Sequence, residues 1–217
     1  MIPPKQEAGE KQVMVITSVI KQKNNPEMLR ISIDGEYAFS MPEDEYYRLN
    51  LYEEKELTQL EIDTIREEAV IKLAKRNGIR LLAVRDRSEQ EVRDRLLQKG
   101  FDADVTESAI LQLKSMGYVN DSLFARKFVS DRLKLKPMSK KALAIELQKK
   151  GIEQDLISEV LDECELDELS IAHRLAKKKY GKYDLNDPKI QRKVYSFLAY
   201  RGYSQNIAQK VLEKMKL

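Results

Sequence analysis

The chain has 217 residues, of which 42% are hydrophobic and 35% are charged, and its formal net charge is +3. No apolar run approaches the length of a membrane-spanning helix and no signal peptide is visible, so a cytoplasmic protein without membrane contact is expected. Cys164 is the only cysteine and His173 is the only histidine. This excludes an internal disulfide and leaves almost no material for a zinc site or a histidine-based triad. We therefore expect no catalytic residues, no metal and no cofactor.

The small net charge hides an uneven distribution along the chain. Residues 1–67 carry 8 basic and 14 acidic side chains, whereas residues 170–217 carry 12 basic and 3 acidic ones. A basic end of this kind suits a polyanion or an acidic protein surface as partner. The alternative is a solvated lysine face that contacts nothing, although the density of the run Lys177-Lys178-Lys179 favours contact.

The first part of the chain is expected to form a small antiparallel sheet. Residues 13–20 are rich in β-branched side chains, and residues 29–33 alternate between apolar and polar ones. Asp34-Gly35 is a two-residue hairpin signal that leads into residues 37–40. These segments predict a three-stranded β-meander.

Two helices are expected to follow the meander. Residues 43–49 predict a short helix with acidic residues in its first turn, where they suit the helix dipole. Residues 58–75 carry apolar side chains at helical spacing and predict a longer helix that runs into the next part of the chain.

From about residue 68 onward, one pattern recurs every 51 residues. The matching positions are Gly100, Gly151 and Gly202; Val92, Leu143 and Val194; Leu96, Leu147 and Leu198; and the pairs Leu73-Ala74, Phe124-Ala125 and Leu175-Ala176. Repeats of this kind indicate one folding unit that is copied along the chain.

Each repeat is predicted to contain three helices. Ser88, with Glu91 three residues later, marks the start of one helix. Gly100 suits the left-handed residue that closes that helix, and Asp104 can cap the next one. By the same reasoning, Asp121 is expected to cap a helix of the second repeat, and Asp187-Pro188 to start one in the third.

The resulting fold class is mainly α: tandem three-helix units behind a small N-terminal antiparallel β-meander. The predicted domains are the meander with its helix (1–67), the first repeat (68–118), the second repeat (119–169) and the third repeat (170–217). The acidic run 162–168, which joins the last two repeats, contains neither Gly nor Pro and is expected to stay helical.

Tyrosines are frequent in the repeats and allow two interpretations. They could stack on nucleic-acid bases, or they could be half-buried caps of small cores. The six that raise this question are Tyr118, Tyr180, Tyr183, Tyr195, Tyr200 and Tyr203.

Several short motifs in the repeats resemble the RecX family. They are LLAVRDRSE at 81–89 with KGF at 99–101, GYVND at 117–121 with FA at 124–125, and EL at 146–147 with KGI at 150–152. One departure is Ser139-Lys140, where the family often has Gly-Pro. The resemblance covers roughly residues 68–217, and the sheet-bearing start is similar to longer members from Gram-positive bacteria.

The resemblance implies a non-enzymatic, negative regulator of the bacterial recombinase RecA, that is, a protein that restrains its target. Family members bind the RecA nucleoprotein filament on single-stranded DNA and restrain its growth, strand exchange, ATP hydrolysis and co-protease activity. They therefore act in recombination, DNA repair and the SOS response. The family also shows DNA affinity of its own, so single-stranded DNA is an expected partner of this chain, and double-stranded DNA is a further candidate.

Basic side chains on the exposed helices are the predicted RecA- or DNA-binding residues. They are Arg85, Arg87, Arg93, Lys99, Lys127, Lys140, Lys141, Lys150, Lys177, Lys178, Lys179 and Arg201. We expect a monomer whose three repeats bridge neighbouring filament subunits. The alternative is a nucleic-acid-binding protein that acts on DNA directly, because three-helix units resemble helix-turn-helix domains.

Overall fold

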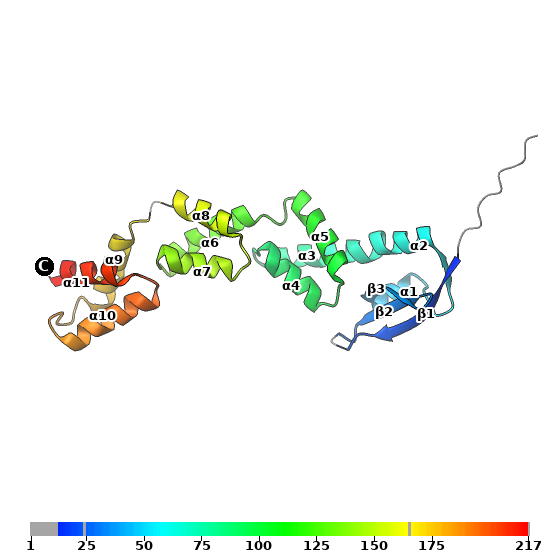
Figure 1. The fold of residues 1–217 in the computed structure, drawn as a ribbon, viewed down its shortest axis with the longest axis horizontal. Coiled ribbons are helices and arrows are strands. Elements are labelled where there is room, and N and C mark those ends of the chain that lie inside the picture. The colour runs from blue at the N-terminus through cyan, green and yellow to red at the C-terminus, as the bar shows by residue number, and fades with distance from the viewer. Residues whose placement is uncertain (1–12, 24, 165, 217) are drawn as a thin grey trace, which may run out of the picture. The chain divides into compact units, whose positions relative to one another are not determined.

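The computed structural model describes residues 13–23, 25–164 and 166–216. These residues fall into two units: one contains the chain up to Arg87 together with Glu91–Val119, and the other contains Ser88–Gln90 and Asn120 onward. Within the described residues, no helix has the length and apolar character needed to cross a membrane. The elements are coloured in chain order in Figure 1.

The first unit opens with an antiparallel sheet. Its strands are β1 (Val13–Lys21), β2 (Met28–Ile33), β3 (Glu36–Pro42) and β4 (Glu56–Thr58), in the order β3-β2-β1-β4. The predicted hairpin is confirmed, because Asp34 and Gly35 have φ values of 50° and 84° between β2 and β3. The three predicted strands form the expected meander, but the sheet also has a fourth strand that was not predicted. The short β4 pairs with the start of β1, and its three residues are too few to show an alternating pattern.

Helices complete the first unit. They are α1 (Glu43–Arg48), α2 (Gln59–Thr64), the π-helical η1 (Ile65–Ile71), α3 (Lys72–Val84), α4 (Glu89–Gln98) and α5 (Ala103–Ser115). Thr58 and Glu61 form a capping box at the start of α2. The segments α2, η1 and α3 follow one another directly, which confirms that the predicted long helix continues into the first repeat.

The second unit contains two sets of three helices, which Figure 1 shows in green to red. They are α6 (Asp121–Leu135), α7 (Lys140–Gln148) and α8 (Gln154–Glu163), then α9 (Glu168–Tyr180), α10 (Pro188–Tyr200) and α11 (Gln205–Lys216). Each set encloses a hydrophobic core of its own.

The repeating pattern corresponds to the buried positions of the helices. The matching residues Leu96, Leu147 and Leu198 are all fully buried. Val92, Leu143 and Val194 are buried to the same extent, and so are Ala74, Ala125 and Ala176. These apolar side chains lie in the hydrophobic cores, and their burial stabilises each repeat.

The three repeat glycines end their helices as predicted. Gly100, Gly151 and Gly202 have φ values of 89°, 77° and 81°. In the third repeat, the Tyr203 amide donates to the Leu198 carbonyl at 3.1 Å and the Gly202 amide donates to the Ala199 carbonyl at 2.9 Å. The other two repeats have the same pair of bonds. This pattern is the Schellman motif, which requires a left-handed residue.

Two predicted helix caps were wrong by one or two residues. The residue before α5 is Asp102 rather than Asp104, and its carboxylate accepts a hydrogen bond from the Ser40 amide at 2.9 Å instead of capping the helix. The cap of α6 is Asn120, whose side chain accepts from the Leu123 amide at 2.9 Å. Asp187 caps α10 with Pro188 behind it, as predicted.

The acidic run between the second and third repeats is not continuously helical, contrary to expectation. The helix α8 ends at Glu163, and Cys164 is extended with a ψ of 106°. A new helix starts after Asp167, whose carboxylate accepts from the Ser170 amide at 2.9 Å. This capping side chain stabilises a helix start at Glu168 in place of a continuous helix. Residue 165 lies outside the described part of the chain.

Candidate nucleic-acid interface

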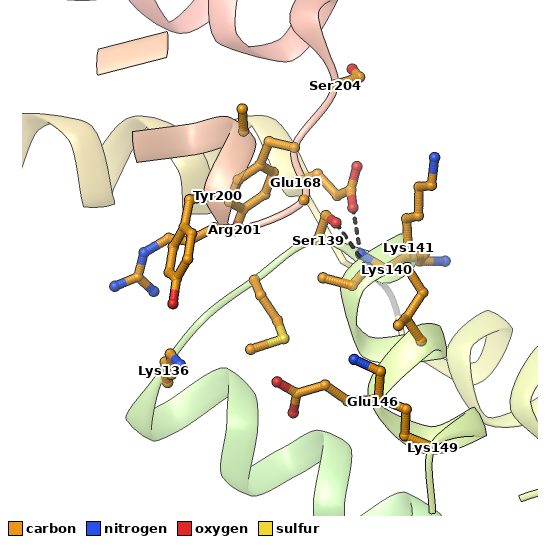
Figure 2. Close-up of a pocket in the computed structure, with 16 residues that line it drawn as sticks. Lys136, Ser139, Lys140, Lys141, Glu146, Lys149, Glu168, Tyr200, Arg201 and Ser204 are labelled. Atoms are coloured by element: carbon orange, nitrogen blue, oxygen red, sulfur yellow. Dashed lines mark hydrogen bonds between the residues drawn. The ribbon is translucent and has the colours of Figure 1, made fainter. Parts of the chain in front are cut away.

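A groove of about 820 Å³ lies in the second unit, between α7 and the turn that follows α10 (Figure 2). Five basic residues line it: Lys136, Lys140, Lys141, Lys149 and Arg201. In Figure 2, Tyr200 and Arg201 lie on one side of the groove and Lys140 and Lys141 on the other. The groove is therefore built from residues that are about 60 positions apart in the sequence.

Hydrogen bonds fix the two walls of the groove to each other. Ser139 is 2% exposed, and its amide donates to the Arg201 carbonyl at 3.1 Å. The Ser139 hydroxyl accepts from the Ala142 amide at 3.1 Å and thus caps α7. The Arg201 guanidinium donates to the Pro137 carbonyl at 2.8 Å. Through these bonds, the Schellman turn at Gly202 in the third repeat contacts the start of α7 in the second repeat.

The acidic side chains of the groove are already engaged by the protein. One Glu168 oxygen accepts a hydrogen bond from the Lys140 amide at 2.6 Å, at the start of α7 (Figure 2). Glu146 pairs with Arg132 at 2.7 Å. Since a helix N-terminus attracts negative charge, the Glu168 carboxylate stabilises α7 where it lies. The groove thus remains predominantly positive.

A second hollow, of about 490 Å³, lies between α9 and α10 and is also basic. It is lined by Lys179, Tyr180, Arg192, Lys193, Ser196, Phe197 and Tyr200. The Lys179 ammonium lies 4.4 Å from the centre of the Phe197 ring, and the Arg201 guanidinium lies 4.9 Å from it. Tyr200 belongs to both hollows and is 83% exposed.

Tyr203 lies three residues from Tyr200 but is 4% exposed. Burial raises the pKa of its hydroxyl to about 12, and the nearby Glu168 carboxylate adds to the rise. The hydroxyl has no hydrogen-bond partner within the described part of the chain. Tyr203 therefore serves as a core residue of the third repeat and remains a neutral phenol at physiological pH.

The structure brings four of the predicted contact residues to these hollows. Lys140, Lys141 and Arg201 line the groove, and Lys179 lines the second hollow. Lys177 and Lys178 are exposed in the same last turn of α9 but line neither hollow.

Three predicted contact residues of the first unit are tied to their own surroundings. Arg85 pairs with Glu91 at 3.0 Å, which raises the pKa of its guanidinium. Arg93 makes a two-pronged pair with Glu107 at 2.5 and 3.0 Å. Arg87 donates to the Leu81 carbonyl at 3.2 Å, and burial beside Arg85 lowers its pKa.

The remaining three predicted contact residues line neither hollow. Lys99 is exposed, and its carbonyl accepts from the Asn25 side chain at 2.7 Å. Lys127 is exposed on α6. The Lys150 ammonium lies 5.9 Å from the centre of the Phe128 ring, and its carbonyl accepts from the Ser88 hydroxyl at 2.5 Å.

Sequence reasoning missed three basic residues of the two hollows: Lys136, Lys149 and Arg192. Two other lining residues were considered from the sequence: Lys193 belongs to the basic part of the third repeat, and Tyr200 is one of the tyrosines that could stack on bases. Neither pattern shows which of these side chains face outward, and Lys136 and Lys149 become neighbours of the third repeat only through the fold.

Comparison with known proteins identifies the repeats. Models of the first, second and third three-helix domains of RecX match residues 74–113, 120–161 and 166–212. The chain is 30% identical to regulatory protein RecX of Clostridioides difficile (strain 630), over 93% of this chain and 95% of the relative. It is also 30% identical to regulatory protein RecX of Listeria innocua serovar 6a, over 90% of this chain and 74% of the relative.

Solved structures agree on the fold. A crystal structure of regulatory protein RecX matches with a TM-score of 0.62 at 21% identity, over 92% of this chain and 99% of that one. The crystal structure of RecX from Lactobacillus salivarius matches with a TM-score of 0.58 at 20% identity, over 67% of this chain and 96% of that one. With three matching domains and relatives that align over nearly the whole length, the chain belongs to the RecX family of regulatory proteins.

Proposed function

We propose that this protein regulates the recombinase RecA by binding the RecA filament on single-stranded DNA, and that its effect is to restrain the filament. The observation that carries the proposal is the set of three tandem copies of one helical unit. A filament presents the same surface many times over, and a protein of repeated units can contact several subunits at once. The relatives are named regulatory proteins, which agrees with a role that needs no chemistry. In this proposal the protein acts in the cytoplasm as a monomer, without catalytic residues, metal or cofactor.

The test is a titration into RecA filaments that are hydrolysing ATP on single-stranded DNA. We expect the ATPase rate to fall at well under one molecule of this protein per RecA subunit. A few bound molecules, each bridging several RecA subunits, are enough to block filament growth. RecA subunits continue to dissociate, so the filaments shorten. Inhibition that requires one molecule for every subunit would contradict the bridging mechanism.

The second candidate function is direct binding to DNA through the three-helix units. The basic groove of the second unit favours it, because clustered lysines and arginines bind phosphates. The two functions differ in the same titration when excess single-stranded DNA is added. If inhibition vanishes with excess DNA, the protein only competes for DNA sites, and the second function takes the place of the first.

Removing the charge of Lys177, Lys178 and Lys179 is expected to weaken binding to the filament or to DNA. Each lysine is replaced by Gln, which removes the charge alone. Replacement by Glu would also place negative charge in the last turn of α9, where it is unfavourable to the helix dipole. Each lost phosphate contact reduces the dependence of affinity on salt, so the loss should shrink as salt is raised. Fluorescence anisotropy at two salt concentrations measures this effect. Unchanged affinity at low salt would make the run a solvated face.

A further inference from the structure

Tyr200 occupies an unusual position for an aromatic residue of a small helical core. Its ring is 83% exposed at the end of α10, and it borders both the groove and the second hollow. The other aromatic residues of these hollows contribute to packing: the Tyr180 and Phe197 rings pack edge to face with centres 5.7 Å apart, and Tyr203 is buried. Tyr200 is not among the residues that form the core of the third repeat or that pack against it.

Each of the two hollows that Tyr200 borders contains cations. Toward the groove, Arg201 is fixed by its bond to the Pro137 carbonyl and by the Phe197 ring. In the second hollow, the Lys179 ammonium lies over the Phe197 ring, 4.4 Å from its centre, and Arg192 and Lys193 are exposed residues of the same lining. Side chains that are already ordered lose less conformational entropy when they bind a ligand.

The charge of the region suits an anionic chain that passes over the ring. The second hollow contains three basic residues and no acidic ones among those that line it. In the groove, Glu146 and Glu168 are occupied by Arg132 and by the α7 backbone. A positively charged groove with an exposed aromatic ring is the arrangement by which proteins hold the phosphates of a single strand while a base stacks on the ring.

We infer that Tyr200 is a stacking platform for an unpaired nucleobase, with the cations of the two hollows holding the adjoining phosphates. The site would select single strands over duplexes. In a duplex both faces of a base are already covered by its neighbours, so only an unpaired base can offer a face to Tyr200. An acidic peptide could use the cations but has no need of the ring. The inference rests on the proposed function, since it names the part of the RecA–DNA filament that this groove would contact.

The test measures the affinity of the full-length protein for a labelled oligothymidylate and for a labelled DNA duplex by fluorescence anisotropy. Tyr200→Ala is expected to weaken binding to oligothymidylate by roughly 5- to 150-fold, the range found for stacked aromatic residues. Binding to the duplex should change far less, and the slope of affinity against salt should stay the same because no phosphate contact is removed.

Two further variants separate stacking from other causes. Tyr200→Phe keeps the ring and should bind oligothymidylate as the unchanged protein does. Tyr118→Ala removes a tyrosine that is 49% exposed in the first unit and outside both hollows, and it should have no effect. Thermal unfolding followed by circular dichroism checks that each variant is folded.

Three results would overturn the inference. They are equal affinity of Tyr200→Ala and the unchanged protein for oligothymidylate, an equal loss for single strand and duplex, and displacement of labelled oligothymidylate from the unchanged protein by oligoglutamate as effectively as by unlabelled oligothymidylate of equal charge. The last result would make the groove a site for acidic peptides. The anisotropy measurements contain no RecA, so they test the stacking site even if the proposed regulation of RecA is wrong. Conversely, full inhibition of the RecA ATPase by Tyr200→Ala would leave the proposed function standing without this site.

Discussion

Gly202→Ala is expected to lower the free energy of unfolding of the second unit by about 2–4 kcal/mol. Two effects contribute: a residue with a side chain is unfavourable in the left-handed conformation, and the added methyl group overpacks its surroundings. Gly202 has a φ of +81°, and an added Cβ would lie 2.6 Å from the Ser139 hydroxyl oxygen and 2.7 Å from the Ala142 Cβ. Neither neighbour can move easily, because Ser139 is buried and caps α7. Urea unfolding followed by circular dichroism measures the change.

Gly117→Ala is the matched control for this prediction. Gly117 has a similar φ of +75°, but an added Cβ would meet nothing within 4 Å. This variant should lose only the conformational part, about 1 kcal/mol. If the two variants lose the same free energy, then the contact between the Gly202 turn and the start of α7 yields without cost, and the walls of the groove are not fixed as described.

The repeats could be predicted because their determinants are local and occur three times. A left-handed glycine must follow each second helix, and Leu96 and its two equivalents must fill the same core position. These requirements leave the same residue types at a fixed spacing. Capping positions were less secure, because Asp, Asn and Ser near a helix start can each bond elsewhere. Asp102 does so when it accepts from Ser40 of the sheet.

The groove could not be predicted, because its residues meet only in the folded chain. Tyr200 and Tyr203 flank the same glycine and look equivalent in the sequence, yet one is 83% exposed and the other 4%. The difference arises because Tyr203 follows the left-handed turn, and its amide bonds back to Leu198 over the core. Likewise, nothing in the sequence indicates that Lys136 and Lys149 of the second repeat lie beside Arg201 of the third.

Deleting residues 170–217 is expected to weaken inhibition of the RecA ATPase by on the order of 100-fold. If the three repeats acted independently, loss of one of them would reduce the inhibitory potency by only about one third. When linked units bind one filament, the second and third contacts form at a high effective concentration, so loss of one unit removes a multiplicative factor from the affinity. The deletion also removes Tyr200, Arg201 and the whole second hollow. The measurement compares the concentrations of the full-length and the shortened protein that halve the ATPase rate.

A full-length variant controls for misfolding of the shortened chain. Lys179→Gln, Arg192→Gln and Lys193→Gln together remove the charge of the second hollow but keep α9 and α10, whose buried residues are unchanged. This variant should show a smaller loss than the deletion, in the same direction and reduced at high salt, because it removes phosphate or carboxylate contacts without removing the unit. Suppose instead that the deleted chain still inhibits at about two thirds of the original potency. The repeats would then act independently of one another, and the bridging of filament subunits, on which the proposed function depends, would have to be abandoned.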